Sequence, residues 1–144
     1  MDPFVARELA TVAHLGQLDK AGRPYIEHPA RVAAAVAHGL GVSHQAVAVA
    51  WLHDVIEDTS VTLESLASQL TAEQVAALAA LTHRDGESRE EYLLRVKQNP
   101  WAVSVKRADI ADNSNAERLA LLDEATRERL LRKYARDMET LEAR

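Results

Sequence analysis

The feature that most constrains the fold is a segment that is apolar on every side. Ser43 is a typical helix-capping residue, and positions 46–52 after it carry only Ala, Val, Trp and Leu. A helix without a polar face has to lie in the middle of a domain, because every side of it must be covered. The sequence therefore predicts a central helix that delivers His53 and Asp54 to the interior of the fold.

The rest of the chain also reads as helical, with short loops between the segments. The aromatic content is 4% while the hydrophobic content is 47%, which favours helices packed closely through Ala, Val and Leu. Capping-box spacings begin at Thr71 and Ser88, and Gly39 and Gly41 close an earlier helix. The predicted helices cover about 3–15, 29–38, 43–52, a short segment from 62, 71–82, 88–97, 99–113 and 126–143.

These elements predict an all-α fold, a single compact multi-helix bundle that forms one domain over residues 1–144. In the last helix, Leu130, Tyr134 and Met138 (or Leu141) form the stripe that packs on the core. Its Arg, Glu and Asp residues are expected to face water.

Composition excludes several classes of function. The formal net charge of −5 argues against a nucleic-acid-binding module, and no apolar run is long enough to span a membrane. The absence of cysteine excludes disulfides and thiolate ligands. The N-terminal residues lack the features of a signal peptide, so a cytoplasmic location is expected.

The run from His53 to Asp58 carries an unusual density of ionisable groups. On a helix, His53, Asp54, Glu57 and Asp58 would fall within about 140° of one another. Three carboxylates this close repel one another, and burying them unpaired is costly. A divalent cation would resolve both problems.

Further ligands must come from other segments. His28 stands at the expected start of a helix, where a capping or core histidine is the alternative interpretation. Asp109 interrupts an otherwise apolar helix and needs a partner, because an unpaired buried carboxylate is expensive. Lys106 and Asn113 share the helical face of Asp109. A surface ion pair between Lys106 and Asp109 is therefore the alternative interpretation of this residue.

Two imidazoles and two carboxylates suit a divalent Mn, Fe, Zn or Co ion. The candidate metal ligands are His28, His53, Asp54 and Asp109. Such an ion activates water and polarises a phosphoryl oxygen, which indicates hydrolysis. Glu57 and Asp58 stay outside the ligand set, where they are placed to orient or deprotonate the water.

Three separated blocks resemble a known family. They read AHLGQ at 13–17 with GRPYIEHP at 22–29, LHDVIEDT at 52–59 and VKRADIADN at 105–113. This pattern resembles the HD-domain phosphohydrolases, and more narrowly the (p)ppGpp hydrolase domain of RelA/SpoT proteins and its small stand-alone relatives.

The resemblance implies an all-α HD-domain bundle with one Mn²⁺ ion held by the four candidate ligands. It implies that Glu57 and Asp58 act on the attacking water, and that Lys20, Tyr25 and Asn113 contact a nucleotide. Lys106 is counted with them as a candidate substrate-binding residue. The implied reaction releases pyrophosphate from the 3′-diphosphate of guanosine tetra- or pentaphosphate, leaving GDP or GTP. The chain would act as a stand-alone hydrolase on a small nucleotide. Binding to nucleic acid or to a membrane is not expected, and a homodimer is the candidate assembly.

The chain departs from the family pattern in two places. Asp19 precedes Lys20 where the family has an Arg, and Asn115 and Ala116 stand where it has Arg and Thr. An Asp is expected to repel a phosphate that an Arg would clamp.

Two alternative functions are compatible with this sequence. One is a phosphohydrolase for another nucleotide, such as an adenosine alarmone or NADPH. The other is a catalytically silent HD module that binds a nucleotide or a partner protein. The complete set of four ligands with Glu57 and Asp58 argues against a silent module, because a retired site has no reason to keep six costly groups.

Overall fold

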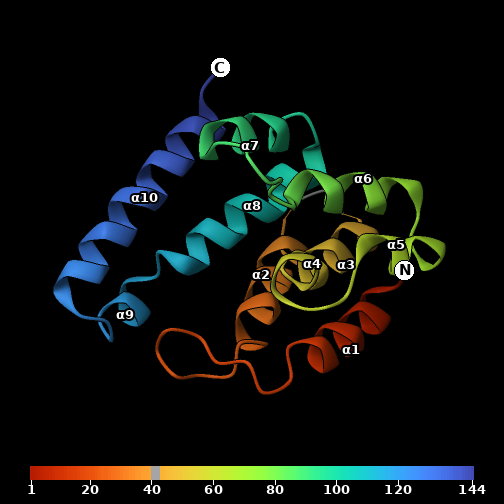
Figure 1. The fold of residues 1–144 in the computed structure, drawn as a ribbon, viewed down its shortest axis with the longest axis horizontal. Helices are drawn as coiled ribbons and strands as arrows, with labels where there is room; N and C mark the ends of the chain where they lie inside the picture. The colour runs from red at the N-terminus through yellow and green to blue at the C-terminus, as the bar shows by residue number, and fades with distance from the viewer. Residues whose placement is uncertain (40–42) are drawn as a thin grey trace.

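The computed structural model describes residues 1–39 and 43–144, and its regular secondary structure there is helical (Figure 1). Leu18 and Pro24 pair in an isolated β-bridge within the loop that joins the first two helices. The elements are α1 (Pro3–Ala13), α2 (Glu27–Ala37), α3 (His44–Leu52), α4 (Val55–Asp58), α5 (Leu63–Leu66), a 3₁₀ helix (Ala67–Gln69), α6 (Ala72–Leu81), α7 (Arg89–Val96), α8 (Pro100–Asn113), α9 (Ala116–Leu119) and α10 (Glu124–Glu142).

Most of the predicted helix starts are confirmed by side-chain caps. The Ser43 and Thr62 hydroxyls accept hydrogen bonds from backbone N–H groups in the first turns of α3 and α5. The capping boxes that begin at Thr71 and Ser88 are both formed. The second helix begins at Glu27, slightly earlier than expected, and Gly41 lies outside the described residues.

Helix α3 is the centre of the bundle, as its apolar sequence predicts. It packs against α1, α2, α6 and α8, and Ala48, Val49 and Leu52 are fully buried. Helix α2 also packs against α8. Helices α2, α3 and α8 therefore lie side by side, although α8 is far from the other two in the sequence (Figure 1).

The long helix α10 lies against α7 and α8. Leu130 and Leu141 are buried as expected, but Asp137 on the same helix is buried too. The prediction that the acidic residues of this helix face water is wrong at Asp137. The Arg89 guanidinium of α7 donates to both of its carboxylate oxygens, at 2.6 and 3.2 Å, and this paired charge can be buried.

None of the helices in residues 1–39 and 43–144 has the length and hydrophobicity that a membrane crossing requires.

Candidate metal centre

The His-Asp doublet lies in a turn between two helices. Helix α3 ends at Leu52, where the predicted helix ends, and α4 begins at Val55, so His53 and Asp54 do not share one helix with Glu57 and Asp58 as the helical placement of this run assumed. Consecutive side chains on a helix diverge by about 100°. In the turn, His53 Nε2 and Asp54 Oδ2 instead approach to 3.1 Å, so both neighbours reach one centre.

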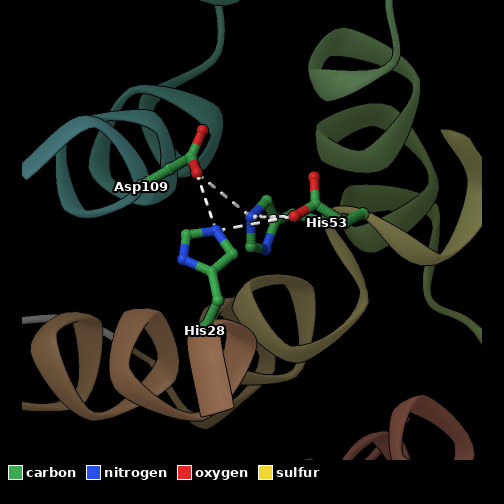
Figure 2. A group of neighbouring side chains, drawn as sticks. His28, His53 and Asp109 are labelled. Carbon is green, nitrogen blue, oxygen red and sulfur yellow. Dashed lines mark hydrogen bonds and ion pairs between the residues drawn. The ribbon is translucent and has the colours of Figure 1, made fainter. Parts of the chain in front are cut away.

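The four predicted metal ligands converge. His28 from α2, His53 and Asp54 from the turn, and Asp109 from α8 each offer one atom, and these atoms lie within 4.8 Å of one another. Figure 2 shows His28, His53 and Asp109 pointing toward one another from separate parts of the chain. Both imidazoles and Asp109 are buried.

The Nδ1 atoms of the two imidazoles have their own partners, and both Nε2 atoms face the carboxylates, with His28 Nε2 2.9 Å from Asp109 Oδ1. His53 Nδ1 lies 2.6 Å from the carbonyl oxygen of Ala50, and His28 Nδ1 lies 2.6 Å from Asp112 Oδ2. Both partners only accept, so the Nδ1 atoms carry the protons. In the neutral rings the Nε2 lone pairs then face carboxylate oxygens.

Without a cation this arrangement is unfavourable. His53 Nε2 is buried and makes no hydrogen bond to any described residue, although Asp54 Oδ2 lies 3.1 Å away and Asp109 Oδ1 3.5 Å away. Lone pairs and carboxylates that converge on one point repel one another unless a positive charge lies between them. The donor set of two imidazoles and two carboxylates therefore fits a divalent ion.

The pKa values of these groups show the same demand for positive charge. Burial alone would lower the pKa of His53, but the carboxylates of Asp54 and Asp109 outweigh it and raise that pKa well above its ordinary value. Burial would raise the pKa of Asp109, but Lys106 and the two imidazoles hold it well below its usual range. The carboxylates of Asp54 and Asp109 therefore stay ionised and attract a cation.

Each carboxylate ligand is oriented by a further donor. The Tyr25 hydroxyl donates to Asp54 Oδ2 at 2.6 Å. Lys106 Nζ lies 2.9 Å from Asp109 Oδ2, and Asn113 Nδ2 donates to Asp109 Oδ1 at 3.0 Å. The Lys106–Asp109 pair forms in the interior, where it offsets the charge of a buried ligand. Outer partners of this kind hold metal ligands in place.

Asp112 is the site residue that sequence reasoning missed. Its Oδ2 accepts from His28 Nδ1, and its Oδ1 accepts from Arg31 and Arg118. Burial would raise its pKa, but the hydrogen bonds from His28 and the two arginines lower it to about 2. Its signal was a second Asp one helical turn after Asp109, on a helix that packs against the one carrying His28.

Glu57 and Asp58 lie on α4, just beyond the ligands, and both side chains are exposed. Glu57 Oε1 accepts from the backbone N–H of His83 at 2.5 Å, which ties α4 to the segment after α6. Partial burial and the charges of Asp54 and Glu57 raise the pKa of Asp58.

A pocket of about 290 Å³ adjoins the centre on the side of His28. Lys20, Tyr25 and Asn113, three of the predicted substrate-binding residues, line it. Lys106 is not in this lining, and its role as a substrate contact stays a prediction. The lining consists of Leu18, Asp19, Lys20, Ala21, Tyr25, His28, Arg31, Asn113, Arg118, Leu119, Leu122, Leu130 and Tyr134.

Asp19 has a structural task in the pocket's loop. Its Oδ1 accepts from the backbone N–H groups of Ala21 and Arg23, both at 2.9 Å. Gly22 completes this turn with a φ of +80°, a conformation that side-chain-bearing residues rarely adopt. The turn carries Lys20 at the pocket.

A helical bundle that gathers two His and two Asp around one point is typical of one class of metal-binding domain. Comparison with known protein families identifies this class. The family model described as the HD domain matches residues 6–141. The chain belongs to the HD-domain family.

Three curated relatives have names that describe hydrolysis of (p)ppGpp. The chain is 36% identical over 116 residues to guanosine-3′,5′-bis(diphosphate) 3′-pyrophosphohydrolase of Haemophilus influenzae, covering 73% of this chain and 17% of the relative. The same-named protein of Aquifex aeolicus is 35% identical over 75% of this chain and 16% of its own length. The bifunctional (p)ppGpp synthase/hydrolase SpoT of Escherichia coli is 33% identical over 76% and 16%. The chain thus spans only about a sixth of the length of these relatives.

The fold is also similar to a solved structure, described as a metazoan ortholog of SpoT that hydrolyzes ppGpp. The TM-score is 0.79 at 19% sequence identity, covering 98% of this chain and 85% of the other. This match confirms the predicted all-α HD-domain bundle.

Proposed function

We propose that this chain is a metal-dependent pyrophosphohydrolase that removes the 3′-diphosphate of (p)ppGpp and leaves GDP or GTP. The observation that carries the proposal is the cage of two imidazole Nε2 atoms and two carboxylates, beside a pocket lined by cationic side chains. The names of the relatives support the choice of substrate.

The proposed ligands of the ion are the four converging residues, and Mn²⁺ is the ion we propose. A divalent ion bound by them would acidify a water ligand and polarise a phosphoryl oxygen. Asp112 and the Ala50 carbonyl hold the imidazoles in the tautomer that presents Nε2. Tyr25 and Asn113 hold the two carboxylates in position.

Glu57 and Asp58 are the proposed groups that handle the attacking water. They lie on α4, just after the turn that carries His53 and Asp54. Their side chains are exposed, so water can reach them. Partial burial and the charges of Asp54 and Glu57 raise the pKa of Asp58, which favours its taking up a proton. Lys20 in the pocket wall would contact a phosphate of the bound nucleotide.

A nucleotide panel tests this proposal. Purified protein with Mn²⁺ is expected to release pyrophosphate from ppGpp and pppGpp, while GTP, ATP and NADPH are left intact. Asp54→Asn serves as the inactive control, because it removes one ligand and keeps the shape of the side chain. Turnover of a 5′-nucleotide or NADPH without turnover of any 3′-diphosphate would refute the proposal.

A further inference from the structure

The pocket beside the metal centre has a cationic wall that the four ligands do not explain. Lys20, Arg31 and Arg118 all line it. Asp19 is the one acidic residue in this described lining, and its Oδ1 is engaged by two backbone N–H groups. The pocket therefore presents a surplus of positive charge to whatever it binds.

Two of these cations are held together by one carboxylate. Arg31 Nε donates to Asp112 Oδ1 at 2.8 Å, and an Arg118 terminal nitrogen donates to the same oxygen at 3.0 Å. Arg118 also donates to the backbone oxygen of Asp112. One negative charge thus holds two guanidinium groups.

The geometry leaves donors for an anion. Arg31 bonds Asp112 through Nε, and its two terminal amino groups make no hydrogen bond to any residue in 1–39 or 43–144. A guanidinium carries five N–H donors, so both arginines keep several for a ligand. Their side chains are 37% and 25% exposed, so a ligand in the pocket can reach them.

The arginines are set at a fixed position relative to the reaction centre. Arg31 lies one turn after His28 on α2, and Asp112 separates the two functions: Oδ2 faces His28 and Oδ1 faces the arginines. Arg118 is brought to the pocket by α9, whose first turn is capped by the Asn115 side chain. A phosphate bound by the arginines would lie on the Oδ1 side of Asp112, while the candidate ligand His28 lies on its Oδ2 side.

We propose that Arg31 and Arg118 form an anion clamp for the phosphate group of the substrate that is not cleaved. Paired guanidinium groups match the oxygens of a phosphate or diphosphate through charge-assisted hydrogen bonds. The clamp gives the pocket a preference for nucleotides that carry a second phosphorylated position. The assignment of that group to the 5′-diphosphate of (p)ppGpp rests on the proposed function.

Kinetics with two substrates tests the clamp. Both ppGpp and guanosine 3′-diphosphate carry the reacting group, but only ppGpp carries the remote 5′-diphosphate. Arg31→Gln and Arg118→Gln are each expected to raise KM for ppGpp about tenfold, with kcat changed less than about twofold, and to leave guanosine 3′-diphosphate unaffected. Arg31→Lys and Arg118→Lys should have a smaller effect on KM than the glutamine variants, because lysine keeps the positive charge but lacks the paired N–H donors of the planar guanidinium group.

Arg107→Gln is the matched control, since Arg107 is an exposed arginine of α8 outside the pocket lining. It should leave both substrates unchanged. Equal losses on both substrates in the Arg31 and Arg118 variants would overturn the clamp. That result would mean that the arginines act through Asp112 on the metal centre.

Binding separates the clamp from the proposed reaction. Calorimetric titration of the Mn²⁺-loaded protein should show GDP binding at least about tenfold more tightly than guanosine, with the difference reduced to less than about threefold in either glutamine variant. If ppGpp is not hydrolysed but this discrimination is found, the clamp stands and the hydrolase proposal fails. Hydrolysis of ppGpp with GDP and guanosine bound equally would refute the clamp alone.

Discussion

The metal centre and the clamp lie on the two sides of Asp112 and are built very differently. The ligands come from α2, α8 and the α3–α4 turn, they are mostly buried, and further hydrogen bonds hold most of them in place. The clamp residues Arg31 and Arg118 come from α2 and the short helix α9, Lys20 comes from the loop before α2, and these side chains are partly or fully exposed. The comparison teaches that the candidate ligands are fixed by the packed bundle, whereas the cations of the pocket are carried in part by short surface segments.

Among the substitutions on the two sides, the removal of a candidate metal ligand is expected to have the largest effect. Asp54→Asn should lower turnover on the order of a thousandfold or more and abolish tight metal binding, because the cage loses one of its two carboxylates. The Tyr25 hydroxyl can still donate to the new side chain, so the fold should survive. Metal analysis of the purified variant and its activity on ppGpp are the measurements, and stoichiometric bound metal in this variant would count against the site.

The buried pair beside the centre should show as a loss of stability. Lys106→Met leaves the Asp109 carboxylate without its nearest cation and should lower the free energy of unfolding by about 3 kcal/mol. Urea unfolding with and without Mn²⁺ measures this. Added Mn²⁺ should recover part of the deficit, since bound metal supplies the missing positive charge.

Arg107→Gln, the neighbouring substitution, is the control for Lys106→Met. A deficit in Lys106→Met no larger than that of Arg107→Gln would contradict the role given to the buried pair.

Asp112 contacts both His28 and the two arginines, so one substitution there should weaken metal binding and anion binding together. Asp112→Asn should reduce metal affinity about 10- to 100-fold, as expected when a metal-bound His loses its carboxylate partner. It should also raise KM for ppGpp, because Arg31 and Arg118 lose the charge that holds them. Titration with Mn²⁺ and steady-state kinetics give the two readouts, and a change in only one of them would show that the two sides are independent.

The smallest effect is expected on the clamp side alone. Asn115→Ala removes the side-chain cap that accepts from the N–H groups of Glu117 and Arg118, and should cost about 1 kcal/mol, confined mainly to α9. KM for ppGpp should rise a few-fold while metal affinity stays the same. A loss of metal affinity would show that α9 supports the centre as well as the clamp.

The sequence predicted the helices and the four converging residues because both leave local signals. Caps and apolar patterns mark where helices begin, and His and Asp residues in apolar surroundings stand out. The end of the helix at Leu52 was predicted, but the turn that follows it was not, because Val55 and Ile56 are apolar and give no sign that the helical direction changes at His53 and Asp54. The burial of Asp137 was missed because its partner Arg89 lies on another helix.

The clamp was missed for a related reason. Arg31 and Arg118 each look like an ordinary surface charge. The packing of α2 against α8 brings Arg31 to Asp112, and the chain from α8 into α9 brings Arg118 to the same carboxylate. The substitution of Asn115 for an expected Arg suggested a lost phosphate contact. The structure instead gives Asn115 the task of capping the helix that carries another Arg.

Asp112 has a further consequence for how the two sides communicate. Its single negative charge is divided between an imidazole and two guanidinium groups. An anion that draws the guanidinium groups toward itself leaves more of that charge to polarise His28, which makes the imidazole a better donor to a cation. Because binding free energies are reciprocal, the cation must strengthen anion binding by the same factor. Through this one carboxylate, a bound anion and a bound cation would each strengthen the binding of the other.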